Sequence, residues 1–543
     1  MKRRDFMKSG ALAGALTFIG PVLKSGDGNG VASGATPFSP QAFELEEATI
    51  AELRSGMESG KFSARSLTEK YLERIKDVDE RGPALNSVIE LNPDALAIAG
   101  ALDKERKAGR TRGPLHGIPV LIKDNIDTAD RMMTTAGSLA LVGAKPVRDS
   151  FVAQRLREAG AVILGKTNLS EWANFRSTHS SSGWSGRGGQ TKNPYALDRN
   201  PCGSSSGSGA AASANLCVVA VGTETDGSVV CPSSASSLVG IKPTVGLISR
   251  AGIIPISHSQ DTAGPMARTV TDAAILLGAL AGVDPRDDAT RAGQGKSAND
   301  YTRFLDAAGL RGARIGVARK FFGFNDRTDA LMNDAIAEMK RQGAIIVDPA
   351  DIPTTGNFDD SEFEVLLYEF KSDLNGYLAG LGPGAGPRTL KDLIEFNEHN
   401  KEKEMPYFGQ EIFLKAEAKG PLTDKAYKTA LAKNQRLSRA EGIDAVMLKN
   451  KLDALIAPTG GPTWPTDLLG GDHFTGGYST PSAVAGYPHI TVPAGYVYGM
   501  PVGLSFIGRA WSEPTLIKLA YAYEQATHLR RPPKFLPTAD LGA

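Results

Sequence analysis

One lysine and two serines in this chain have the types and spacing needed for nucleophilic catalysis. Lys123 ends the apolar run IPVLIK, Ser204 lies in CGSSSGS, and Ser228 ends GTETDGS. A serine hydroxyl becomes a nucleophile when a base takes its proton, and a lysine can be that base only while it is neutral. Burial disfavours the charged form of lysine, and the apolar residues before Lys123 suit such burial.

A second motif, GAVILGKT at 160–167, matches the pattern of a phosphate-binding P-loop. A true P-loop follows a strand, and its small residues let backbone amides cradle phosphates. Here the residues before Gly160, FVAQRLREA, predict a helix, and AVIL itself predicts a strand. The context therefore argues against nucleotide binding.

A third motif, GSSSG at 203–207, matches the nucleophile elbow of α/β-hydrolases and would make Ser205 the nucleophile. An elbow needs a buried strand before the turn, but KNPYALDRNPC contains two prolines and does not predict one. The histidines that follow in the required chain order are His473, His489 and His528. An esterase that uses Ser205 therefore stays open as an alternative.

The elements before the lysine are predicted to be helical. Three amphipathic patterns cover 48–59, 66–80 and 92–109, and Ser66 with Glu69 predicts a capping box for the second. From about residue 113 short apolar runs alternate with helical patterns, which is typical of an α/β domain. The predicted strands are 118–123, 161–166, 217–222, 238–242, 313–318, 344–348 and 452–457.

Glycine and serine are concentrated in one segment, 179–209, where eight serines and seven glycines fill 31 positions. Such a composition is usual in flexible linkers. This segment, however, lies between predicted strands of the α/β region. We expect a loop that approaches a ligand closely with its backbone and hydroxyl groups.

Overall composition narrows the possible functions of the chain. It has 543 residues, with 61 basic and 60 acidic side chains, so no charge excess indicates nucleic acid or a strongly charged partner. Only three cysteines occur, which excludes a disulfide scaffold, and no Cys or His spacing indicates a metal site.

The first 35 residues are predicted to be an export signal. Basic residues precede a short, mildly apolar core, GALAGALTFIG, and RRDFMK at 3–8 resembles a twin-arginine signal. We therefore expect a periplasmic or secreted protein that leaves the membrane after signal removal. An uncleaved membrane anchor is the alternative.

Several motifs together resemble the amidase signature family. Its serine-rich run and its Gly-Thr-Asp-x-Gly-Gly-Ser motif match the segments of Ser204 and Ser228, at the same serine spacing (228 − 204 = 24). Further matches are GIPVLIKDN (117–125), GKTNLSEWA (165–173), VGIKPTVGLISRAG (239–252), DTAGPMART (261–269), PSAVAGYPHITVPAG (481–495) and MPVGLSFIG (500–508). The resemblance is tightest over 113–275 and loosest over the charged, helix-rich stretch 292–450. The loop sequences are most similar to those of peptide amidases.

This resemblance implies a single large α/β/α domain over about 40–535, with a mixed, twisted central sheet covered by helices. It implies a cofactor-independent hydrolase of a small or peptide amide, with Ser228 as nucleophile, Ser204 as bridging hydroxyl and Lys123 as base. It also implies a cis peptide after Gly203. The oxyanion hole would be the backbone amides of Thr225, Asp226, Gly227 and Ser228.

Some positions depart from the family pattern. The family has Gly where this chain has Asp226, whose carboxylate would lie beside the site; its role stays open, and orienting the amide nitrogen of the substrate is one candidate. Asp261 is predicted to be a structural hydrogen-bond acceptor. Cys202 and Cys231 flank the two serine segments and are either a disulfide or two small buried hydrophobes. The rival functions are a non-catalytic binding protein and an amidotransferase-like subunit, and we expect a monomer or homodimer.

Overall fold

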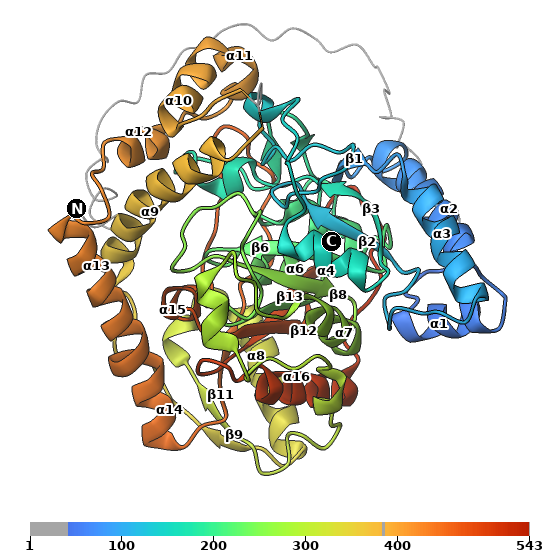
Figure 1. Cartoon of the computed structure of the whole chain (residues 1–543). Helices are drawn as coiled ribbons and strands as arrows, with labels where there is room; N and C mark the ends of the chain where they lie inside the picture. Colours follow the sequence, from blue (N-terminus) through green and yellow to red (C-terminus); the bar gives the residue numbers. More distant parts are fainter. Residues whose placement is uncertain (1–41, 383–385, 542–543) are drawn as a thin grey trace, which may run out of the picture. The chain divides into compact units, whose positions relative to one another are not determined.

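The computed structural model describes residues 42–382 and 386–541, and its centre is a mixed sheet of eleven strands (Figure 1). The strand order is β1-β3-β2-β6-β8-β7-β12-β13-β11-β9-β10. The three-strand groups β3-β2-β6 and β11-β9-β10 are parallel, and the other neighbours are antiparallel. The strands are β1 (Val88–Leu91), β2 (Pro119–Lys123), β3 (Val162–Thr167), β6 (Val219–Glu224), β7 (Val239–Lys242), β8 (Thr262–Ala267), β9 (Arg314–Val317), β10 (Ile345–Val347), β11 (Ala454–Pro458), β12 (His489–Val497) and β13 (Met500–Ile507), and a separate hairpin pairs β4 (Trp184–Ser185) with β5 (Gly189–Gln190).

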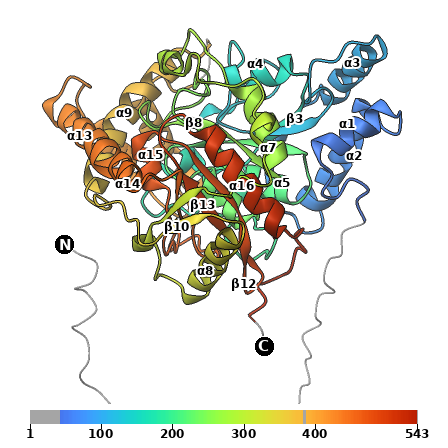
Figure 2. The ribbon, with the colours of Figure 1, turned by 90° about the horizontal axis from the view of Figure 1, so that it is seen from below.

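Helices cover both faces of this sheet, which confirms the predicted α/β/α class. Helices α7, α16 and α8 pack side by side against the sheet, with α16 in the middle (Figure 2). The helices are α1 (Ile50–Glu58), α2 (Ala64–Arg74), α3 (Ala95–Lys107), α4 (Phe151–Glu158), α5 (Ser206–Ser213), α6 (Val230–Ala235), α7 (Val270–Leu280), α8 (Asp326–Arg341), α9 (Asp359–Ala379), α10 (Leu390–His399), α11 (Lys401–Glu404), α12 (Glu411–Glu417), α13 (Lys425–Gln435), α14 (Asp444–Asn450), α15 (Thr480–Ala485) and α16 (Glu513–Thr527).

The parallel strands β2, β3 and β6 are the part of the sheet that the sequence predicts best. Every residue of these three strands is buried, because helices lie on both sides. Strands of this kind read as continuous apolar runs, which are easy to recognise in a sequence. All seven predicted strands are found, with ends shifted by one or two residues.

Four sheet strands, β1, β8, β12 and β13, are not predicted by the sequence pattern. Three of them contain glycine or proline, which lower strand propensity, as in TAGPMA of β8. Glycine is needed there for close packing, because a Cβ on Gly264 would collide with the carbonyl oxygen of Ile241 on β7. Pairing with the neighbouring strands, rather than local strand propensity, therefore makes these segments form strands.

The capping box predicted from Ser66 and Glu69 is wrong by one turn. Helix α2 begins at Ala64, and Ser63 is its N-cap: the Ser66 amide donates to Ser63 Oγ, and the Ser63 amide donates to Ser66 Oγ. Glu69 instead pairs with Arg65 one turn earlier. Two serines three residues apart thus satisfy each other, and the helix starts earlier than its apolar pattern indicates.

The stretch predicted to be charged and helical contains two kinds of structure. Strands β9 and β10 belong to the central sheet and helix α8 packs against it, whereas α9–α14 form an arc along one side of the sheet (Figure 1). Leu366, Phe370, Leu374 and Leu378 of α9 are buried in a second apolar cluster that also includes Trp172 and Ile254. The boundaries 40–535, 113–275 and 292–450 stay predictions.

The predicted export signal, residues 1–35, lies outside the described residues. Within the described ranges, no helix combines the length and apolar character that crossing a membrane requires.

Candidate active site

Strand β2 places Lys123 beside the end of strand β6, because the two strands are parallel neighbours and end at the same edge of the sheet. The Lys123 ammonium nitrogen Nζ lies 2.8 Å from Ser204 Oγ and 2.9 Å from Thr223 Oγ1, and 3.3 Å from the Thr223 carbonyl oxygen. Both Lys123 and Ser204 are fully buried. The predicted base and the predicted bridging serine are therefore in direct contact.

Burial determines the charge of Lys123. It is the largest influence and lowers the pKa of the amine to about 7, although the carboxylates of Asp261 and Glu224 act in the opposite direction. A lysine with this pKa is partly neutral at physiological pH, as a base must be.

The loop before helix α5 presents Ser204 to the lysine. The peptide bond between Gly203 and Ser204 is cis, as the resemblance implied. A Cβ on Gly203 would collide with Ser170 Oγ, so a larger residue there would require Ser170 to move. The Ser204 carbonyl oxygen accepts a hydrogen bond of 3.1 Å from the Ser170 amide, which fixes the loop from the other side.

The turn between β6 and α6 carries Ser228 and is held by a buried carboxylate. Glu224 Oε2 accepts hydrogen bonds from the amides of Val229 and Val230, at 2.8 and 3.0 Å. The Ser205 amide donates to the Ser228 carbonyl oxygen at 3.1 Å, so the two serine loops are joined through their backbones. The Ser228 hydroxyl itself forms no hydrogen bond with a residue of the described ranges, and its side chain keeps slight solvent access.

The predicted oxyanion hole is available for a ligand. Among the described residues, the backbone amides of Thr225, Asp226, Gly227 and Ser228 have no acceptor. Four consecutive free N–H groups are unusual in a turn that is almost entirely buried, because such groups are normally paired. Their free state beside Ser228 fits donors that await a developing negative charge.

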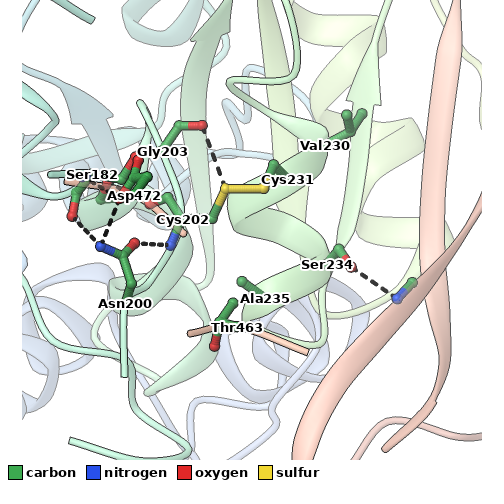
Figure 3. The surroundings of a disulfide bond; sticks show 12 residues. Ser182, Asn200, Cys202, Gly203, Val230, Cys231, Ser234, Ala235, Thr463 and Asp472 are labelled. Atoms are coloured by element: carbon green, nitrogen blue, oxygen red, sulfur yellow. Dashed lines mark hydrogen bonds between the residues drawn. A yellow bond between two sulfur atoms is a disulfide. The ribbon is translucent and has the colours of Figure 1, made fainter. Parts of the chain in front are cut away.

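A disulfide joins Cys202 to Cys231, which decides between the two interpretations of these cysteines (Figure 3). It connects the loop of Ser204 to helix α6, which directly follows Ser228, across a Cα–Cα distance of 6.0 Å. The Cys202 amide also donates to Asn200 Oδ1 at 2.8 Å. The disulfide is therefore a covalent link between the supports of the two serines.

The two aspartates near the serine turn have different surroundings. Asp261 accepts hydrogen bonds from the amides of Ile256 and Ser257 and from the Thr225 hydroxyl, so it orders the turn. Asp226 Oδ2 accepts from the Thr480 hydroxyl at 2.7 Å, whereas its Oδ1 is buried without a hydrogen-bond partner in the described ranges.

Ser205 does not have the surroundings of an elbow nucleophile. Its hydroxyl donates to the Thr223 carbonyl oxygen at 3.0 Å and accepts from the Thr223 amide at 3.1 Å. His489 instead contacts Ser505 and Ser482, and His473 pairs with Asp467. The third histidine, His528, is an exposed residue at the end of α16. The esterase alternative thus lacks a histidine base.

The P-loop interpretation is also excluded by the structure. Helix α4 ends two residues before Gly160, and AVILGKT continues as the buried strand β3. Lys166 Nζ donates to the Ile126 carbonyl oxygen and to Thr134 Oγ1 inside the protein.

The structure also shows a side-chain cluster that the sequence did not indicate. His258 contacts Asp373 at 2.8 Å and Glu369 at 3.3 Å, and in the described part of the chain this is the one group with metal-ligand geometry. Burial lowers the pKa of His258, but the two carboxylates reverse this effect and the net pKa is raised. The cluster therefore behaves as an ion pair between a loop and α9. More than 100 residues separate His258 from the two carboxylates on α9, so no sequence spacing could reveal the cluster.

The glycine- and serine-rich segment 179–209 is mostly buried and includes the β4–β5 hairpin and the start of α5. It is therefore part of the folded core rather than a solvated linker, and its approach to a ligand stays a prediction.

The family model for amidases matches residues 66–517 of this chain. The chain belongs to the amidase family. A probable amidase of Arabidopsis thaliana is 46% identical over 503 residues, which cover 91% of this chain and 93% of that protein. The native peptide amidase of Stenotrophomonas maltophilia is 52% identical in its crystal structure, with a TM-score of 0.86, and covers 91% of this chain and 100% of that one.

This amidase is also similar to one component of a glutamyl-tRNA(Gln) amidotransferase from Pseudomonas syringae. That similarity is 34% identity over 502 residues, covering 90% of this chain and 100% of the amidotransferase component. The higher identity to amidases and peptide amidase favours hydrolysis over amide transfer. The chain is an amide-hydrolysing enzyme.

Proposed function

We propose that this amidase hydrolyses its substrate through an acyl-enzyme on Ser228, with Ser204 as proton bridge and Lys123 as base. The contact between Lys123 Nζ and Ser204 Oγ, 2.8 Å inside a fully buried site, is the observation that carries the proposal. A neutral amine has two N–H donors and one lone pair. The two oxygens of Thr223 can take both donors, which leaves the lone pair facing Ser204.

In the acylation step, Lys123 accepts the Ser204 proton while Ser204 accepts the Ser228 proton. The Ser228 oxygen bonds to the carbonyl carbon, and the carbonyl oxygen becomes an anion that the free amides of 225–228 stabilise. The C–N bond then breaks, and the proton returns through Ser204 to the leaving nitrogen. Water repeats the sequence on the ester, so that amide and water give acid and ammonia or amine.

We propose the amide of a peptide C-terminus as the substrate class. The similarity to a peptide amidase at 52% identity supports this class, as does the resemblance of the loop sequences to peptide amidases.

We expect ammonia release from peptide C-terminal amides, with internal peptide bonds left intact. The test is a comparison of kcat/KM among peptide amides, aryl anilides, short aliphatic amides and long-chain fatty amides. A large preference for fatty amides would overturn the proposed substrate, and cleavage of internal bonds would overturn the restriction to chain ends.

We also propose export by the twin-arginine route, from the sequence of residues 1–35. The Cys202–Cys231 disulfide supports it, because disulfides persist in oxidising compartments such as the periplasm. We expect that replacing Arg3 and Arg4 together by lysine, which keeps the charge, leaves active full-length enzyme in the cytoplasm. The measurement is activity after cell fractionation, and export at the wild-type level would refute the signal.

A further inference from the structure

A cavity of about 460 Å³ opens beside the proposed catalytic groups. Its lining includes Thr223, Thr225 and Asn125, and Thr223 is in direct contact with Lys123. This volume is within the range of about 300–1,000 Å³ that is usual for small-molecule pockets. A ligand in the cavity would therefore reach the end of β6 and the turn with the free amides.

Part of the cavity wall is apolar. Ile253, Ile254, Pro255 and Ile256, from the loop after β7, line it together with Ala173. The cations on its wall are already paired, since Arg250 pairs with Asp287, Arg286 with Asp284 and His258 with Asp373. The other two carboxyl groups, Glu224 and Asp261, accept hydrogen bonds from backbone amides. An uncharged ligand with an apolar group suits such a wall, because no isolated charge has to be matched.

Asn125 supplies one polar group that has no partner. Its side chain is 3% exposed, and its Nδ2 donates to Thr223 Oγ1 at 3.0 Å. Its Oδ1 is buried and accepts no hydrogen bond from the described residues, although Asn125 lines the cavity. A buried acceptor of this kind favours a ligand that brings an N–H group.

Helix α9 contributes one of its faces to the cavity wall. Ser372, Asp373, Gly376 and Tyr377 line the cavity, at the spacing that places residues on one side of a helix. Buried leucines and Phe370 on the other side of α9 fix this wall to the rest of the fold. The catalytic groups and the pocket wall thus come from different parts of the chain.

We propose that this cavity binds the acyl residue next to the scissile amide, with a large apolar side chain against the isoleucines and its backbone N–H donated to Asn125 Oδ1. This proposal rests on the proposed amidase function and makes it narrower. The favoured substrates are amides of N-acylated amino acids with large apolar side chains, and Gly376 and Asn125 determine this preference.

The first test fills the cavity from Gly376. A Cβ at this helical position meets no atom within 4 Å, so Gly376→Phe adds a side chain without a clash at its base. We expect the ratio of kcat/KM for N-acetylphenylalaninamide to kcat/KM for N-acetylglycinamide to fall at least about tenfold. Gly100→Phe is the matched control, because Gly100 is also helical, has the same open surroundings and does not line the cavity.

An unchanged ratio between the two substrates in Gly376→Phe would overturn the pocket assignment while amide hydrolysis itself stays established. Calorimetry gives a second readout that needs no turnover. In a Ser228→Ala background, Gly376→Phe should weaken the binding of N-acetylphenylalaninamide at least about tenfold. Equal affinity would contradict the pocket even if the enzyme did not hydrolyse this amide.

The second test addresses Asn125 with two substrates that differ in one group. N-acetylphenylalaninamide has an N–H where O-acetylphenyllactamide has an ester oxygen. We expect the wild-type enzyme to prefer the first about five- to tenfold in kcat/KM, the usual effect of one hydrogen bond, and Asn125→Ala to lose this preference. The ratio cancels any general loss of activity that arises through Thr223, and a preference that persists in Asn125→Ala would overturn the role of Asn125.

Discussion

Ser228→Ala should abolish turnover, with a loss of roughly 10⁴-fold or more in kcat, because it removes the atom that bonds to the substrate. Lys123→Ala should cause a loss almost as large, and Ser204→Ala should leave a small residual activity. The losses should be non-additive, since groups that act as one unit fail together. The measurement is kcat for the three single variants and for Lys123→Ala combined with Ser228→Ala.

Ser205→Ala is the control for this series. Ser205 lies in the same loop as Ser204, but both hydrogen bonds of its hydroxyl go to the Thr223 backbone. We therefore expect it to retain far more activity than Ser228→Ala, provided that circular dichroism shows a folded protein. Full activity in Ser228→Ala together with inactivity of Ser205→Ala would contradict the assignment and restore the esterase alternative.

Activity should depend on pH through a single group on the acid side. The pKa of Lys123 is lowered to about 7, chiefly by burial, and only the neutral amine can accept the Ser204 proton. As the pH falls well below 7, protonation of Lys123 should reduce kcat/KM about tenfold for each pH unit, so that the value at pH 5 is roughly a hundredfold below the alkaline plateau. Above pH 7 the amine is mainly neutral, so kcat/KM should reach a plateau.

Lys123→Ala provides the control for this profile. Other buried carboxyl groups also have raised pKa values, among them Asp261 at about 6. If Lys123 is the base, the residual activity of Lys123→Ala should no longer decline on the acid side. A decline that persists unchanged in this variant would assign the ionisation to another group.

The sequence predicts the parallel core of the sheet because strands buried on both faces are continuous apolar runs, as in β2 and β6. It does not predict β8 or β12, where glycine and proline lower strand propensity and neighbouring strands supply the stability. Helix α2 shows a similar limit, since its start depends on a reciprocal bond between Ser63 and Ser66 that the apolar pattern does not reveal.

The candidate site is likewise predictable only where its residues belong to local sequence motifs. Local motifs and the family resemblance predict Lys123, Ser204 and Ser228. Thr223 and Asn125 are recognised only by their contacts in the folded structure. Thr223 lies within the motif GTETDGS, and Asn125 lies within GIPVLIKDN. Both segments match the family, but the match alone indicates no function for these two residues. The contribution of α9 to the cavity wall cannot be predicted from the sequence, because only the folded structure brings α9 next to the site.

The covalent state of Ser228 during turnover tests the central claim most directly. Wild-type enzyme should be mixed with a slowly deacylating amide or ester substrate, quenched in acid, and measured by intact and peptide mass spectrometry. The account predicts an added acyl mass on the peptide that contains Ser228 and none in Ser228→Ala. An acyl group on Ser205 or Ser204, or turnover with an unmodified Ser228 under conditions that trap an acyl-enzyme, would contradict it.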